Sequence, residues 1–150
     1  MKMRAALLGA VAVMGLAPAA FAERGTDGEV KLTFPQAVSI MNPYLSGGTK
    51  DIYASSMVLE PLAGLDPNGV MVPKLVTEIP TLENGGISAD MTSITWKLLP
   101  DLKWSDGSAV TADDAVFTWQ YCTHPEGGCS QATKFEGIAS VEAVDPSTIK

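Results

Sequence analysis

The sequence predicts a mixed α/β fold. Residues 30–35 and 93–99 alternate apolar and polar side chains, which is the period of a half-buried strand. Residues 112–122 instead carry apolar side chains at helical spacing, with Ala115, Trp119 and Cys122 on one face. The chain has 150 residues, of which 46% are hydrophobic and 18% are charged, so its composition is that of a globular protein.

The N-terminal segment has the layout of a secretory signal peptide. Two basic residues precede an uncharged apolar stretch over residues 5–16, and an A-x-A cleavage pattern ends at Ala22. We therefore expect a signal peptide over residues 1–22, cleavage between Ala22 and Glu23, and a mature chain of residues 23–150 in the periplasm. A membrane anchor is the alternative, but an apolar core of about 12 residues is shorter than the roughly 20 that span a bilayer.

The segment after the signal predicts a strand, a loop and a short helix. Pro35 ends the strand that begins at residue 30, and Asn42-Pro43 signals a turn in the loop that follows. A helix of two to three turns is expected from Asp51, with Thr49 as its N-cap. Pro61 stops this helix, because the residue before a proline disfavours helical backbone.

Turn residues then divide the chain into hairpins. Residues 62–76 predict a hairpin, because Asp66-Pro67-Asn68-Gly69 has the pattern of a type I turn. Such a cluster also suggests calcium, but the spaced ligands and the terminal Glu of a calcium loop are missing. Further turns are expected at residues 84–86 and 145–146, and a new strand begins before Lys150.

The acidic run over residues 104–119 allows two interpretations. Paired carboxylates are typical of acid/base or metal chemistry, but they also serve in turns and at helix starts. Asp106 is followed by Gly107, which predicts a turn that closes a short extended segment. This acidic residue therefore has a structural role in the backbone.

The other two acids of the run open the predicted helix. Thr111 and Asp114, three residues apart, form a variant of the capping box. Asp113 and Asp114 lie in the first turn, where the helix dipole favours negative charge. Neighbouring helical side chains point about 100° apart, so these two carboxylates are poorly placed to share a metal or a proton. We interpret the pair as a helix start.

The two cysteines bracket a tight loop. Cys122 and Cys129 flank a segment with one Pro and two Gly, so their sulfurs can approach each other. In an oxidising compartment the expected state is a disulfide. Free thiols, a metal site and a redox site are the alternatives. His124 lies between the cysteines, but two sulfurs and one nitrogen fall short of a closed zinc site, and the spacing is not C-x-x-C.

The sequence contains few other motifs that carry chemistry, and we expect no catalytic residue, no metal and no cofactor. The formal charge of −7 argues against a nucleic-acid partner. The sequence contains no G-x-S-x-G, H-E-x-x-H or phosphate-binding glycine loop. Two alternatives stay open: a secreted enzyme, hydrolase-like, that uses Asp113, Asp114 or His124, and an exported protein-interaction module that uses its hairpin edges.

An ordered set of motifs resembles the extracellular solute-binding proteins of ABC importers, in the peptide, oligopeptide and nickel class known as family 5. In that family a Glu-Pro-Leu segment leads into a hairpin with Asp-x-x-Gly, and a Pro-x-Leu follows. A Trp-x-Leu strand and a Lys-Trp-x-Asp-Gly turn then precede a helix that opens with Thr-Ala-Asp. The matching residues are Glu60-Pro61-Leu62, Asp66 with Gly69, Pro73 with Leu75, Trp96-Lys97-Leu98, Lys103-Trp104 with Asp106-Gly107, and Thr111 to Val116.

The chain departs from this family pattern in two places. The family often has an Arg and then a Gly in a segment that here reads Leu98-Leu99-Pro100-Asp101-Leu102. Met91 stands where the family usually has a turn glycine. These departures leave the fold that the resemblance implies unchanged.

The resemblance implies the N-terminal part of a two-lobed periplasmic-binding-protein fold, type II-like, with an extra subdomain. Residues 23–150 would be a truncated part of it, containing a strand of the first lobe and the extra subdomain. The implied function is to capture a peptide or similar small solute and to deliver it to the membrane permease of an ABC importer. The candidate ligand-facing residues are Met41, Asn42, Pro43 and Tyr44, although ordinary loop packing is the alternative for them.

Overall fold

The computed structural model describes residue 28 and residues 31–150. The predicted signal peptide and its cleavage site, between Ala22 and Glu23, lie outside the described residues. The chain divides into two units, residues 1–33 and residues 34–150. The elements described below all belong to the second unit.

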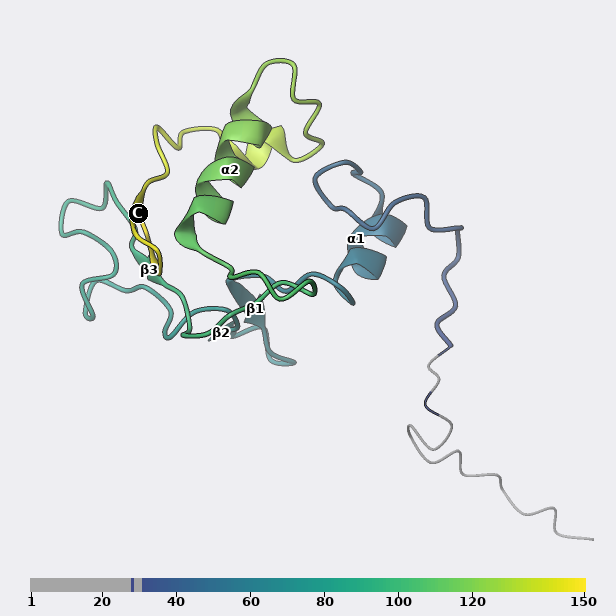
Figure 1. Ribbon diagram of the computed structural model, residues 1–150, viewed down its shortest axis with the longest axis horizontal. Coiled ribbons are helices and arrows are strands. Elements are labelled where there is room, and N and C mark those ends of the chain that lie inside the picture. Colours follow the sequence, from purple (N-terminus) through teal and green to yellow (C-terminus); the bar gives the residue numbers. More distant parts are fainter. Residues whose placement is uncertain (1–27, 29–30) are drawn as a thin grey trace, which may run out of the picture. The chain divides into compact units, whose positions relative to one another are not determined.

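The second unit contains both helices and small antiparallel sheets, which confirms the mixed α/β prediction (Figure 1). Its elements follow the chain in this order: α1 (Thr49–Ser55), β1 (Ala63–Leu65), β2 (Met71–Pro73), β3 (Trp96–Lys97), α2 (Ala112–Thr123), the 3₁₀ helix η1 (Ala132–Phe135), β4 (Ala143–Asp145) and β5 (Thr148–Ile149).

Two predictions for the N-terminal elements are wrong. Residues 31–34 form no strand with any described residue, because a strand forms only where a neighbour pairs with its backbone and the described sheets are built from other segments. The N-cap of α1 is Gly48, whose backbone is extended, and Thr49 is already helical. The helix also ends at Ser55, before the turn that precedes Pro61.

The predicted first hairpin is confirmed. Strands β1 and β2 pair antiparallel, with Gly64 opposite Val72. Between them the Asp66 side chain accepts hydrogen bonds from the backbone N–H groups of Asn68 and Val70, both at 2.8 Å. Gly69 has a φ of +79°, which only glycine adopts without strain.

The second sheet has three strands in the order β3-β5-β4. The predicted strand over residues 93–99 shrinks to Trp96–Lys97, because the extended segment changes its partner along its length. Ile94 pairs with Ile87, Trp96 with Ile149, and Leu98 with Val76. Figure 1 shows the C-terminus in this sheet beside β3.

The core lies between this sheet and the first turn of α2. Its buried members are Val76, Leu98, Ala112 and Ile149. Ala112 is completely buried at the helix start, so the sheet fixes the position of the α2 N-terminus. Backbone bonds reinforce this contact, since the Ala112 N–H donates to the Pro146 carbonyl at 2.9 Å.

Candidate functional site

The candidate ligand loop, residues 41–44, lies just before α1 and contains an internal turn. The Asn42 side chain accepts a hydrogen bond from the Tyr44 N–H at 2.9 Å, and the Asn42 carbonyl accepts one from the Leu45 N–H at 3.2 Å. This arrangement is an Asx-turn, which Asn favours because its side chain mimics a backbone acceptor. The Asn42 amide therefore serves the loop's own backbone, and Met41 is left 40% exposed.

The chain after the disulfide holds the far side of this loop. The Ser130 N–H donates to the Tyr44 carbonyl at 2.7 Å, and the Gln131 side-chain amide donates to the Pro43 carbonyl at 3.3 Å. The Tyr44 ring also packs on Phe135, with ring centroids 6.4 Å apart. Burial raises the pKa of the Tyr44 phenol. Packing and solvent exposure therefore coexist in the loop, with Tyr44 packed on Phe135 and Met41 exposed.

Asp51 in α1 holds the near side of the loop, although it is not among the residues that the sequence predicts to face the ligand. Its side chain is almost fully buried, with the whole residue 1% exposed. One carboxylate oxygen accepts from the Ser39 N–H at 2.7 Å and from the Ile40 N–H at 3.4 Å. The other accepts from the Ser46 hydroxyl at 2.7 Å. Asp51 thus bonds to the chain on both sides of the candidate loop.

The groups around Asp51 favour the ionised form of its side chain. The Lys50 ammonium lies 2.8 Å from one carboxylate oxygen and 2.9 Å from the other. The hydrogen bond from Lys50, followed by those from Ser46 and the Ser39 backbone, holds the pKa of the Asp51 carboxyl well below its ordinary value. A carboxylate this close to the helix start is visible in the sequence, but its partners lie up to twelve residues away.

The surface around α1 is rich in exposed apolar side chains. Between residues 38 and 59, the large hydrophobic residues at least 36% exposed are Val38, Met41, Leu45, Ile52, Tyr53, Met57, Val58 and Leu59. Single exposed apolar residues are normal, whereas contiguous groups of them are typical of interaction or ligand surfaces. The candidate loop therefore lies in a stretch of the chain that is rich in exposed apolar side chains.

The acidic run has a structural role. The Asp106 carboxylate accepts from the Ser108 hydroxyl at 2.6 Å and from the Ser108 N–H at 2.9 Å, and these two bonds lower its pKa. Gly107 in this turn has a φ of +90°. At the next element Thr111 is the N-cap of α2, and the Asp114 carboxylate accepts from the Thr111 N–H at 2.8 Å in a capping box.

The disulfide is present. Cys122 and Cys129 are joined, with their Cα atoms 4.9 Å apart. His124 between them is the C-cap of α2, and its Nδ1 accepts a hydrogen bond from the Glu126 N–H at 3.1 Å. The disulfide therefore ties the last turn of α2 to Ser130, whose N–H contacts the candidate loop.

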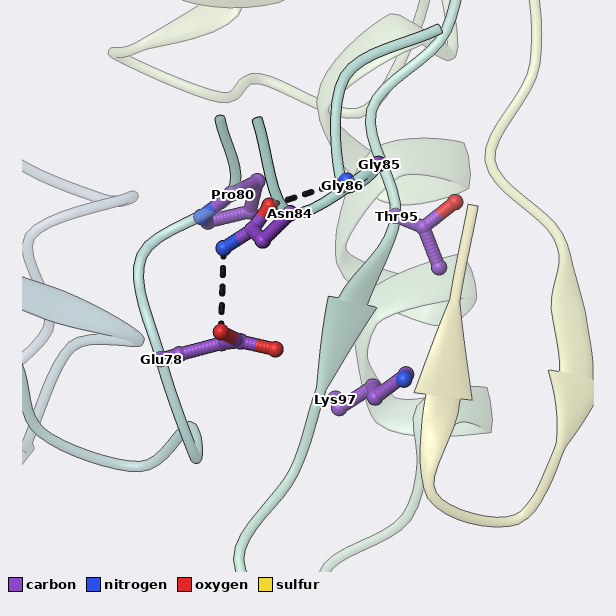
Figure 2. A pocket seen from close by; sticks show the side chains of 7 residues that line it. All are labelled: Glu78, Pro80, Asn84, Gly85, Gly86, Thr95 and Lys97. Carbon is purple, nitrogen blue, oxygen red and sulfur yellow. Dashed lines mark hydrogen bonds between the residues drawn. The ribbon is translucent and has the colours of Figure 1, made fainter. Parts of the chain in front are cut away.

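A small pocket lies elsewhere, between β3 and the turn at residues 84–86. Figure 2 shows Glu78 on one wall and Lys97, from β3, on the other. The Asn84 side-chain amide donates to the Glu78 carboxylate at 3.0 Å and to the Ile79 carbonyl at 2.9 Å. With a volume of about 100 Å³, the pocket is smaller than the roughly 300–1,000 Å³ typical of ligand sites. We interpret it as part of the turn.

Among residue 28 and residues 31–150, no group of three or more His, Cys, Asp or Glu side chains is arranged to hold a metal ion. No helix in the same part of the chain combines the length and apolarity of a bilayer span.

Comparisons with known proteins agree with this geometry. A curated Brucella ovis protein, named as an ABC transporter peptide-binding protein, is 38% identical over 63 residues, which are 42% of this chain and 12% of that protein. Listeria monocytogenes OppA bound to peptide superposes with a TM-score of 0.66 and 25% identity, over 76% of this chain and 25% of that one. Campylobacter jejuni NikZ in complex with Ni(L-His) superposes with a TM-score of 0.63 and 27% identity, over 76% of this chain and 22% of that one.

The chain thus spans about an eighth of the length of the curated relatives that it matches. The family model that describes the bacterial extracellular solute-binding proteins, family 5 middle region, matches residues 70–150, which is more than half of the chain. The matched residues include the second hairpin strand, the three-stranded sheet and α2. The chain therefore belongs to the bacterial extracellular solute-binding proteins of family 5.

Proposed function

We propose that this chain is part of the solute-capturing component of an ABC importer. It binds a peptide or a similar small solute in the periplasm and passes it, chemically unchanged, to a membrane permease. The observation that carries the proposal is the family match, which more than half of the chain supports. The relative named for peptide binding and the structure bound to a peptide favour peptides as the solute class.

The candidate loop is the local contact with the solute. Its backbone is fixed on one side by Asp51 and on the other by Ser130, so little conformational entropy is lost when a solute binds. Met41 offers an exposed, polarisable side chain, which adapts to solutes of different shape. In binding proteins of this kind, two lobes close on the solute by a hinge motion.

A binding screen on the full-length protein tests the function. The probes are an equimolar pool of synthetic tripeptides, the nickel–histidine complex and mannopinic acid, since the last is bound by a third structurally similar protein, MoaA. A probe at 100 times its Kd stabilises the folded state by about 2.7 kcal/mol, which is visible as a rise in Tm. Mass spectrometry then recovers the solute unchanged. The proposal fails if no probe raises the Tm or if the solute is converted.

A matched pair of methionine variants tests the loop. Met41→Ala weakens binding of the solute found in the screen without lowering the Tm, because the side chain is exposed. Met71→Ala is the control, since Met71 is 54% exposed on β2 and lies outside the loop. Equal affinities of the two variants contradict the assignment of the loop.

Export is tested on the mature protein. We expect the protein in the periplasmic fraction, with Glu23 as its first residue after removal of residues 1–22. N-terminal sequencing reads this directly. A mature protein that begins at Met1, or that stays in the cytoplasm, contradicts the proposal.

A further inference from the structure

The bonds of Asp51 frame the loop proposed to contact the solute. Upstream of the loop, Asp51 accepts from the backbone N–H groups of Ser39 and Ile40. Downstream, it accepts from the Ser46 hydroxyl, which in turn accepts from the Gly48 N–H at 3.1 Å. One side chain therefore joins both ends of residues 39–46 to the first turn of α1.

The chemistry of this site requires a carboxylate. The two oxygens together accept bonds from two backbone N–H groups, one hydroxyl and the Lys50 ammonium, and an ionised carboxylate is an acceptor only. Charge-assisted bonds of this kind are about twice as strong as neutral ones. An Asn in the same place keeps the shape, but it turns one acceptor into a donor that faces Lys50 and the Ser46 hydroxyl.

Neither the capping of α1 nor the core packing explains this arrangement. Asp51 is the third helical residue after Gly48, but its side chain bonds to residues 39, 40, 46 and 50, and the Gly48 N–H donates to the Ser46 hydroxyl instead. The buried core of the unit lies between the sheet and α2 and does not include Asp51. What the carboxylate holds is the loop.

We propose that Asp51 is a positioning residue that keeps residues 39–46, and with them Met41 to Tyr44, in the conformation that receives the solute. This inference rests on the proposed function, because it assumes that the loop contacts the solute. It adds a specific residue that does not touch the solute but on which solute affinity depends.

The test compares two Asp→Asn variants of the full-length protein. Asp51→Asn removes the charge that holds the loop. Asp66→Asn is the matched control, because Asp66 also accepts from two backbone N–H groups at 2.8 Å but lies in the β1–β2 turn. Ser46→Ala is a milder second variant, used as well so that the test does not depend on Asp51→Asn folding.

Two readouts separate the loop from general stability. Hydrogen–deuterium exchange of the Ser39 and Ile40 amides reports whether Asp51 holds the loop, with or without a solute. Affinity for the tripeptide pool reports whether the held loop matters for binding. We expect Asp51→Asn to speed exchange of these two amides about tenfold and to weaken affinity about tenfold, since loss of one charge-assisted bond is worth about one decade. Ser46→Ala shifts both in the same direction, and Asp66→Asn shifts neither.

Each other outcome has a defined meaning. Unchanged exchange at Ser39 and Ile40 in both loop variants overturns the positioning role. Faster exchange with unchanged tripeptide affinity also overturns the inference, because the loop is then held but not used. If the wild-type protein binds no probe, the proposed function fails by itself, and the exchange data still decide whether Asp51 holds the loop.

Discussion

Removal of the Cys122–Cys129 disulfide gives the most quantitative prediction. The perturbation is the double variant Cys122→Ala/Cys129→Ala, in which Ala avoids placing a hydroxyl at the buried Cys122 position. The bridge joins residues with a sequence separation of 7, so it closes a short loop. On the chain-entropy model, the freedom regained by the unfolded chain destabilises the folded state by about 2.5 kcal/mol.

The assay is native-state hydrogen exchange in the full-length protein. Exchange reports the free energy of opening at each amide, so it locates the loss of stability in α2 and the disulfide loop. A loss of about 2.5 kcal/mol corresponds to roughly 70-fold faster exchange in the α2 amides that open together with the disulfide loop. The Ser130 amide, which bonds to the Tyr44 carbonyl, is expected to lose protection as well.

The control is chemical. Reduction of the wild-type protein under native conditions removes the same constraint without a change of sequence, so it should speed exchange at the same amides. An effect below about threefold in both experiments refutes the reasoning, because the loop would then be equally restricted in the unfolded chain without the bond. A large effect in the variant alone points to packing of the sulfur atoms and not to loop closure.

Four further predictions concern single residues, and each is measured by thermal or urea unfolding. Met91→Gly stabilises the folded state by about 0.5 kcal/mol. Met91 holds a φ of +56° while 73% exposed, and the backbone strain that Gly relieves slightly exceeds the cost of the extra freedom that Gly gives the unfolded chain. Asp114→Ala costs about 1 kcal/mol through loss of the capping box. Gly127→Ala costs about 1–3 kcal/mol, because a Cβ there overlaps the Tyr121 carbonyl. The lowered pKa of Asp51 adds stability that is present above pH ~4 and is lost as the pH falls further, so the gap in Tm between wild type and Asp51→Asn narrows from pH 6 to pH 3.

Elements set by local rules could be predicted from the sequence. The β1–β2 turn follows from Asp66 and Gly69, and the α2 start follows from Thr111 and Asp114, because each pattern brings together residues at most three positions apart. The disulfide also depends on a short loop. At the start of α1 two neighbouring residues can serve as the N-cap. The sequence predicts Thr49, whereas the N-cap in the structure is Gly48, one residue earlier.

The family resemblance predicts backbone features that hydrophobic periodicity does not. Family members usually have a glycine at the position of Met91 and often one in the segment that contains Asp101. Both residues have a positive φ here, +56° and +58°, which is the conformation that glycine favours. Asp tolerates this left-handed conformation better than Met, because its short polar side chain bonds locally. The departures from the family pattern therefore keep the backbone shape, and the strain falls mainly on Met91.

The candidate site depends on contacts that no local rule predicts. Pro43 meets Gln131 across 88 positions of sequence, and Asp51 meets Ser39 across 12. An acid at the start of a short helix is locally indistinguishable from a dipole-stabilising residue, so only the fold shows that its bonds go to the loop. The same reasoning explains why Asp106 and Asp114, which in the sequence look more like parts of a reaction centre, are structural: each accepts a bond from a residue two or three positions away. The proposed positioning role of Asp51 therefore rests on partners that are distant in sequence, whereas the bonds of Asp106 and Asp114 stay within their own turns.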